Sequence, residues 1–271
     1  MNRTSPWIVR MPGPDDSAAT LRLLCFPYAG GAAHIYADWR QPMPQQVLLQ
    51  VVQLPGRGAR FREAPLRSID EMALGVVHAL QQDPDPRPLI FFGHSMGALV
   101  AFETARLMRR CGMRLPCRLL VSGYIAPHLG YPEPPIHALS DAELGDRLRE
   151  YEGTPAEVLQ HPELLSLLMP MVRADFAAVE TYSYQTEGAL PCPIAAFGGH
   201  NDSMIPEAAI AAWREHTRGG FSMRMFEGGH FFIHTARDAL LARVVADIEE
   251  TLGSAAATSA VGRTPAMEAI R

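Results

Sequence analysis

The sequence contains no lysine: all 24 of its basic residues are arginine. We attribute this to a bias in composition and assign it no functional meaning. Runs of positive charge are also missing, and the formal net charge is -5 at pH 7. Because nucleic-acid binding depends on neutralising many phosphates, this composition argues against a nucleic-acid partner. A small-molecule or acyl substrate fits it better.

Long apolar runs are absent as well. No stretch approaches the roughly 20 consecutive apolar residues of a membrane-spanning helix. The first 16 residues contain Pro6, Pro12 and Pro14 and lack the apolar core of a secretory signal. We therefore expect a cytoplasmic protein with no membrane association.

Cysteine is scarce, and none of the four cysteines (Cys25, Cys111, Cys117 and Cys192) belongs to a CxxC pair. Scattered cysteines in a cytoplasmic protein are typically reduced and buried, whereas disulfide frameworks and zinc sites need characteristic spacings. We expect buried free thiols, no metal and no cofactor.

The chain of 271 residues is 48% hydrophobic, and neither a repeat nor a shift in composition divides it. Short apolar runs alternate with longer stretches of helical period, which is typical of a mostly parallel sheet covered by helices on both faces. We predict one domain over residues 1–252. The predicted strands are residues 21–26, 47–54, 89–92, 118–122, 194–197 and 222–226.

Helical spacing of apolar residues predicts a helix over 69–80, which Ser68 and Glu71 begin with a capping box, and a closing helix that reaches residue 252. Residues 253–271 are rich in small residues and have no periodic apolar face. We expect this tail to be disordered.

One stretch, residues 126–187, interrupts the alternation of strands and helices. It has helical patterning and prolines but no convincing strand, and Ser140 with Glu143 predicts another capping box. We predict an inserted helical lid here. Its apolar helical surface either packs onto the core or partly lines an acyl pocket. The residues of that surface are Leu164, Leu165, Leu168, Met169, Met171 and Val172.

The segment Gly93-His94-Ser95-Met96-Gly97 matches the pattern GxSxG. A predicted strand precedes it and a predicted helix over 98–110 follows, so Ser95 falls on a strand-turn-helix. This context holds the nucleophilic serine of the α/β-hydrolase fold, and the glycines relieve crowding around the turn. We predict an α/β-hydrolase fold in which Ser95 is the nucleophile and not a structural serine.

Two later strands each lead into a loop with a residue suited to complete a triad. The run 193–197 leads to Asp202, and the run 222–226 leads to His230. The order serine, acid, histidine is expected for this fold, and its sites gather at the carboxyl ends of strands. We predict that His230 is the base and that Asp202 orients it. Alternatively, Asp202 only caps the next helix and His230 is an ordinary loop histidine, with His234 as reserve base.

Backbone N–H groups stabilise the oxyanion that forms when a carbonyl is attacked. Met96 directly follows the nucleophile and supplies one such donor. For the second we choose Ala29, in the loop after the first core strand, where small residues let the backbone approach a substrate.

Three arginines, Arg57, Arg60 and Arg62, cluster in one predicted loop. They could meet a phosphate, although a solvated loop is favoured. The segment 56–58 lacks the spacing of a dinucleotide or P-loop fingerprint, so we reject nucleotide binding.

Four motifs together resemble those of type II thioesterases, in the same order and over about residues 21–252. The resemblance implies the triad Ser95, Asp202 and His230, the oxyanion donors Ala29 and Met96, and a flexible helical lid. One local departure is that Ser203 follows Asp202, where proline is frequent. The motifs are FPYAGG at 26–31, LPGR at 54–57, GHSMG at 93–97 and GGHFF at 228–232.

The resemblance implies hydrolysis of aberrant or stalled acyl groups from the phosphopantetheine arm of carrier proteins in nonribosomal peptide and polyketide synthesis. Acyl or peptidyl carrier proteins would be transient partners. We identify no association element and expect a monomer. The alternatives are a medium-chain acyl thioesterase of fatty acid synthesis, an acyltransferase, a general carboxylesterase, and a catalytically silent synthase-binding protein. The first three use the same triad, which activates the acyl group without fixing its acceptor.

Overall fold

The computed structural model describes the backbone of residues 5–13, 17–131, 133–150 and 161–261. In this part of the chain seven strands form one sheet in the order β1-β3-β2-β4-β5-β6-β7. β1 runs antiparallel to β3, and the other neighbouring strands are parallel. The strands are β1 (Ile8–Arg10), β2 (Leu21–Phe26), β3 (Val47–Val52), β4 (Leu89–His94), β5 (Arg118–Ser122), β6 (Ile194–Gly199) and β7 (Phe221–Phe226).

All six predicted strands are present, with ends that differ by at most two residues from the predictions. β1 was not predicted. It has three residues, too few to show a period, and its backbone pairing with β3, in which Ile8 faces Val52, defines it.

The helices lie either outside or within the insertion between β5 and β6. Those outside it are α1 (Ile69–Gln81), α2 (Met96–Arg110), α6 (Glu207–Ala211), α7 (Phe232–Thr235) and α8 (Arg237–Val261), with the 3-10 helices η1 (Ala33–Trp39), η2 (Gly58–Arg60) and η4 (Ala212–His216). The inserted helices are η3 (Pro127–Leu129), α3 (Asp141–Glu150) and α5 (Pro162–Glu180).

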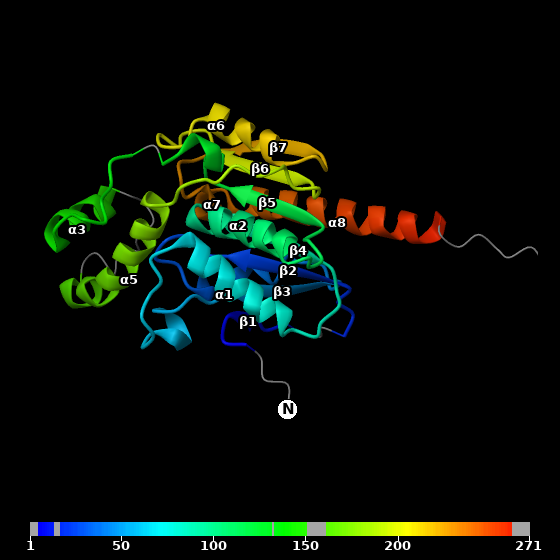
Figure 1. Ribbon diagram of the computed structural model, residues 1–271, viewed down its shortest axis with the longest axis horizontal. Coiled ribbons are helices and arrows are strands. Elements are labelled where there is room, and N and C mark those ends of the chain that lie inside the picture. Colours follow the sequence, from blue (N-terminus) through cyan, green and yellow to red (C-terminus); the bar gives the residue numbers. More distant parts are fainter. Residues whose placement is uncertain (1–4, 14–16, 132, 151–160, 262–271) are drawn as a thin grey trace, which may run out of the picture.

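Two apolar cores lie on opposite faces of the sheet because side chains along each strand alternate in direction. In β2, Leu24 and Phe26 join the core under α1 and α2, whereas Leu23 and Cys25 join the core under α8. Figure 1 shows α1 and α2 on one side of the sheet and α8 on the other. Strands buried on both faces appear in the sequence as continuous apolar runs.

The two predicted capping boxes have different outcomes. Ser140 and Glu143 bond to each other at the start of α3, and the Glu143 N–H donates to the Ser140 hydroxyl. Ser68 does precede α1, but its side chain makes no capping hydrogen bond, so that part of the prediction was wrong.

The insertion between β5 and β6 lies at one end of the sheet (Figure 1). Its described residues contain helices and no strand. It has a small apolar core of its own, which includes Leu144 and Leu148 of α3 and Met169 of α5. We call this insertion the lid; its predicted limits, 126–187, stay a prediction, and residues 132 and 151–160 lie outside the described residues.

The closing helix α8 extends further than predicted, to Val261. Residues 253–261, which we expected to be disordered, continue it; they contain four alanines, the residue with the highest helix propensity. Residues 262–271 lie outside the described part, and disorder there stays a prediction.

All four cysteines are free thiols. Cys25 and Cys192 are buried as expected, whereas Cys111 is exposed at the end of α2. Within the described residues, no helix is both long and apolar enough to cross a membrane.

Candidate active site

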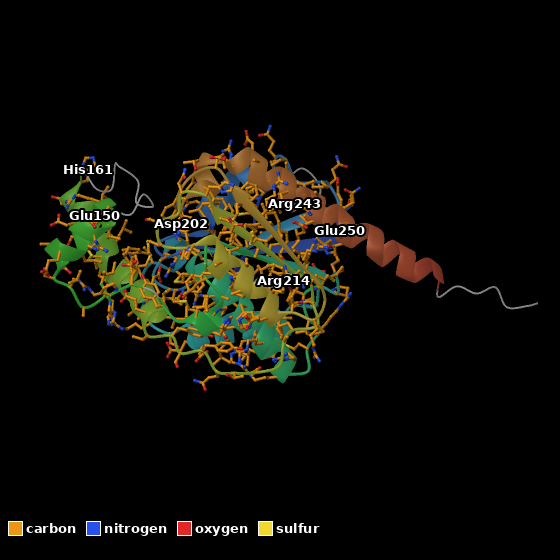
Figure 2. All side chains as sticks on the ribbon, turned by 90° about the horizontal axis from the view of Figure 1, so that it is seen from above. Glu150, His161, Asp202, Arg214, Arg243 and Glu250 are labelled. Atoms are coloured by element: carbon orange, nitrogen blue, oxygen red, sulfur yellow. The ribbon has the colours of Figure 1, made fainter. Side chains whose placement is uncertain are left out.

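The predicted catalytic side chains follow three parallel strands. Ser95 comes directly after β4, Asp202 lies in the loop after β6, and His230 lies in the loop after β7. Because these strands are parallel, their carboxyl ends share one edge of the sheet. Figure 2 shows Asp202 on the side of the core that faces the lid, with Glu150 and His161 farther out on the lid.

Ser95 occupies a strained turn between β4 and α2. Its φ is 53°, and no other non-glycine residue in the described part has a positive φ. A Cβ on Gly93 would lie 2.2 Å from the carbonyl oxygen of Gly97, and a Cβ on Gly97 would lie 2.1 Å from that of Phe26. The turn is therefore possible only with glycine at both positions. Such strain is typical of residues that a fold holds for chemistry.

His230 connects the serine and the aspartate. Its Nε2 lies 3.0 Å from the Oγ of Ser95, and its Nδ1 lies 2.8 Å from the Oδ2 of Asp202. The other oxygen of Asp202 accepts the N–H groups of Met204, at 3.0 Å, and Ile205, at 3.2 Å. The structure thus brings the three predicted residues together in the geometry that proton transfer from serine to histidine requires.

The alternative in which Asp202 caps a helix does not fit the structure. α6 begins at Glu207, with Pro206 in the capping position and no side-chain capping bond. The carboxylate of Asp202 holds its own loop and His230 instead.

Two other histidines lie near the site and have partners of their own. The Nε2 of His234 lies 2.9 Å from the hydroxyl of Tyr28, and the Nδ1 of His94 lies 2.9 Å from the hydroxyl of Ser122. Burial lowers the pKa of His234, and burial together with the neighbouring histidines lowers the pKa of His94. His230 is therefore the histidine that faces Ser95, and both neighbours favour their neutral forms.

A cavity of about 340 Å³ opens beside Ser95 and His230, between the lid and the core. Leu168, Met171 and Val172 of α5 contribute to its mainly apolar wall. The apolar lid surface was expected either to pack onto the core or to line part of an acyl pocket, and these three residues line the pocket. Leu164 is exposed. An apolar wall beside a nucleophile suits the acyl part of a substrate.

The two predicted oxyanion donors, Ala29 and Met96, line the same cavity as Ser95. Met96 is the first residue of α2, so its N–H is one of those that lack an acceptor within the helix, at the positive end of the helix dipole. Ala29 lies in the loop after β2, which neighbours β4 in the sheet. Both positions suit donors to a developing negative charge.

The arginine cluster differs from the solvated loop that we favoured. Arg57 is buried and binds the carboxylate of Asp175 through two nitrogens, at 2.8 and 2.6 Å. Arg60 is also buried and pairs with Glu63. Only Arg62 is exposed among the three. Intramolecular partners therefore occupy both Arg57 and Arg60.

Asp175 is not among the site residues predicted from the sequence. The residue is fully buried in the lid helix α5 and also accepts the N–H of Gly30, next to Ala29. The available signal was a lone acidic residue within an apolar stretch of the lid. Elsewhere, no group of three or more histidine, cysteine or acidic side chains among the described residues could hold a metal ion.

Comparison with known families agrees with this geometry. A family model described as a thioesterase domain matches residues 21–251. This chain belongs to the thioesterase family. Thioesterase PikA5 from Streptomyces venezuelae is 41% identical over 229 residues, which cover 84% of this chain and 80% of PikA5. The chain is thus a hydrolase that acts on thioesters.

Another relative of this thioesterase, from Brevibacillus parabrevis, is 43% identical over 237 residues, which cover 86% of this chain and 90% of the relative. It is named linear gramicidin dehydrogenase LgrE. That name describes redox chemistry, whereas the family model and PikA5 place this chain among the thioesterases.

A solved structure supports the fold as well as the family. The type II thioesterase BorB from the borrelidin biosynthetic cluster superposes with a TM-score of 0.81 at 36% identity, covering 91% of this chain and 99% of BorB. The predicted α/β-hydrolase fold and the predicted family are thereby confirmed.

Proposed function

We propose that the thioesterase uses Ser95 as nucleophile, His230 as general base and acid, and Asp202 to orient His230. The observation that carries this proposal is the continuous hydrogen-bonded series from the Ser95 hydroxyl through His230 to Asp202, at 3.0 and 2.8 Å, beside the cavity. A serine hydroxyl is a weak nucleophile until a base accepts its proton, and this series supplies the base.

In the first half of the reaction, the Oγ of Ser95 attacks the thioester carbonyl carbon while its proton passes to the Nε2 of His230. The carbonyl oxygen becomes an oxyanion, which the N–H groups of Ala29 and Met96 stabilise. The carbon–sulfur bond then breaks, and the sulfur leaves as a thiol with the proton from His230. The acyl group remains on Ser95 as an ester.

In the second half, His230 takes a proton from a water molecule as the water oxygen attacks the ester carbonyl. A second oxyanion forms at the same N–H groups and collapses. The Oγ of Ser95 leaves with the proton from His230, and a carboxylic acid is released. Every proton transfer uses the one imidazole, so the proposed reaction needs no metal or cofactor.

For the substrate, we propose acyl groups on the phosphopantetheine arm of carrier proteins, where hydrolysis removes aberrant or stalled units. BorB, a type II thioesterase of a biosynthetic cluster, and LgrE, named for linear gramicidin, support this choice. The cavity between lid and core has a matching shape, since a thin arm can deliver its acyl end beside Ser95. The arm belongs to the carrier protein and is not a cofactor of this chain.

We further propose that carrier proteins are transient partners, that the thioesterase is a monomer, and that it acts in the cytoplasm. An editing enzyme serves many carrier domains in turn, which favours short contacts over a stable complex. The four unpaired cysteines suit a reducing compartment.

The test is a time course, by intact-protein mass spectrometry, of acetyl and longer acyl groups leaving a phosphopantetheinylated carrier protein. We expect the wild-type protein to remove them and Ser95→Ala to lose on the order of 10³-fold or more in rate. Ser203→Ala is the matched control, because Ser203 is an exposed serine beside Asp202 and should retain the wild-type rate.

Two of the alternatives, and the proposed role of Ser95, have distinct outcomes. Rapid ester cleavage with no loss of carrier-bound acyl groups would indicate a general carboxylesterase. Transfer of the acyl group to an added acceptor in place of water would indicate an acyltransferase. A rate that Ser95→Ala leaves intact would refute the proposed role of Ser95.

A further inference from the structure

The carboxylate of Asp175, on the lid helix α5, contacts residues of the core. The Oδ2 of Asp175 accepts the N–H of Gly30 at 2.7 Å and a hydrogen bond from Nη1 of Arg57 at 2.8 Å, while its Oδ1 accepts Nη2 of Arg57 at 2.6 Å. The side chain of Asp175 is 0% exposed and that of Arg57 is 2% exposed. Lid and core are thus joined by a charged contact without solvent.

Arg57 extends this contact to the next residue of the same loop. Its Nη1 also donates to the carbonyl oxygen of Gly31 at 3.2 Å. Asp175 and Arg57 therefore fix the N–H of Gly30 and the carbonyl of Gly31, which follow Ala29 directly. We call residues 28–31 the oxyanion loop.

The oxyanion loop is a tight turn closed by a hydrogen bond from the Gly31 N–H to the Tyr28 carbonyl oxygen at 2.9 Å. Gly30 has a φ of +78°, which glycine adopts readily and other residues rarely do. A turn with glycine at this position can change its backbone angles at little cost. The direction of the Ala29 N–H depends on these angles, so external contacts are needed to hold it.

A buried ion pair is a poor device for stability alone, because removing two charges from water costs about as much as their attraction returns. A bidentate pair between arginine and carboxylate instead fixes the position and the orientation of both side chains. Here the two fixed side chains hydrogen-bond to the backbone of the loop that carries an oxyanion donor. Val172, three residues before Asp175 on α5, lines the same cavity as Gly30, and a Cβ added to Gly30 would come within 3.6 Å of the Cγ2 of Val172.

We propose that Asp175 is a positioning residue that, together with Arg57, holds the oxyanion loop in its productive geometry only while α5 rests on the core. The proposal rests on the function given above for Ser95 and Ala29. If α5 moves away from the core, the N–H of Gly30 loses its acceptor and the loop is released. Closure of the lid over an acyl group and completion of the oxyanion site are then one event.

The experiment compares Asp175→Asn with the wild-type protein on a short thioester, S-hexanoyl-N-acetylcysteamine, which needs no carrier protein. The asparagine keeps the shape of the side chain, and its amide oxygen can still accept the Gly30 N–H. It lacks the negative charge that pairs with Arg57. A fluorophosphonate titration counts the reactive serines, so kcat is expressed per working site. A trifluoromethyl ketone, which forms an oxyanion on Ser95, measures oxyanion stabilisation separately from substrate binding.

We expect kcat per site to fall about 10- to 100-fold, because small displacements of a catalytic group have effects of this size. The inhibition constant of the ketone should rise in proportion, while KM changes little. Arg57→Lys, which keeps the charge and loses the bidentate geometry, should have the same effect. If Asp175→Asn contains no serine that reacts with the fluorophosphonate, the comparison of Arg57→Lys with the wild-type protein takes its place.

Arg173→Lys is the matched control. Arg173 lies on the same helix, two residues from Asp175, and binds the carbonyl oxygens of His137 and Leu139 within the lid. It should leave the ketone constant unchanged. Unchanged kcat and ketone binding in Asp175→Asn would overturn the proposal, and so would a higher KM with unchanged kcat, which would assign the pair to shaping the acyl pocket.

Failure of the inference differs from failure of the proposed function. If hydrolysis depends on Ser95 but not on Asp175, only the positioning role is refuted. If Ser95→Ala retains the wild-type rate, the proposed function is refuted whatever Asp175→Asn does.

Discussion

The Oδ2 of Asp202 lies 2.8 Å from the Nδ1 of His230, while its Oδ1 accepts two backbone N–H groups. Because the two carboxylate oxygens have separate partners, the effect of Asp202→Asn can be predicted. The amide oxygen would stay with the two N–H groups, and the amide nitrogen would face His230. A donor there forces Nδ1 to act as acceptor, so Nε2 carries the proton and cannot accept one from Ser95. We expect kcat to fall on the order of 10⁴-fold, as in other Ser-His-Asp triads, with KM little changed.

Steady-state kinetics on a short thioester checks this prediction, with thermal unfolding to show that Asp202→Asn remains folded. A loss of less than about tenfold would contradict the orienting role of Asp202.

His230, in the loop after β7, and His234, in α7, should respond differently to substitution. His230 faces Ser95 at 3.0 Å, whereas His234 bonds to Tyr28. We expect His230→Ala to lose on the order of 10³-fold or more in kcat and His234→Gln to lose less than about tenfold. The rate of Ser95 labelling by a fluorophosphonate gives an independent reading. Equal losses in both variants would show that His234 shares the proton transfer.

Much of the fold follows from local sequence. β2, β4 and β5 are buried on both faces, so their residues form short continuous apolar runs that indicate strands without any structure. Ser95 and Asp202 could be found for the same reason, because β4 and β6 are such runs. His230 follows β7, whose residues alternate between half-buried and exposed, so its position rests on the order of the triad and on the loop after that strand. The short edge strand β1 could not, because its three residues leave no pattern.

Long-range pairing could not be predicted from local sequence. Arg57 and Asp175 are separated by 118 positions, and nothing in the pattern around either residue indicates the other. Arg57 was interpreted as part of a solvated loop because arginines in glycine-rich loops are usually exposed. Its burial depends on the lid helix packing over that loop, which is a property of the whole fold.

Glycine at position 97 is required by the close approach of α2 to β2. A Cβ there would lie 2.1 Å from the carbonyl oxygen of Phe26, so Gly97→Ala must displace the start of α2, which carries the Met96 N–H. We expect a loss of about 1–3 kcal/mol in the free energy of unfolding, typical of overpacking, together with a lower kcat. Gly188→Ala is the control, since a Cβ at Gly188 meets nothing within 4 Å.

Urea unfolding and kinetics on both variants check this prediction. If Gly97→Ala had the stability and kcat of Gly188→Ala, the contact between α2 and the end of β2 would be looser than the structure describes.

The stability of the protein should fall in mild acid because of buried histidines. His216 is buried near Arg106, and its Nε2 lies 2.8 Å from the Nδ1 of His128. Burial, followed by the nearby His128 and Arg106, lowers its pKa from 6.5 to about 4. Between these values the unfolded chain binds a proton that the folded chain does not bind. The free energy of unfolding therefore decreases as the pH falls below about 6.5 and recovers as the pH rises.

From this shift we expect His216 alone to account for a loss of about 2 kcal/mol between about pH 7.5 and pH 5. His94 and His234, whose pKa values are also lowered, act in the same direction. Urea unfolding at the two pH values measures the loss, and His216→Gln, which cannot titrate, should reduce it. A variant that loses as much stability in acid as the wild-type protein would show that His216 is already protonated in the folded state, or that its proton makes no difference to folding.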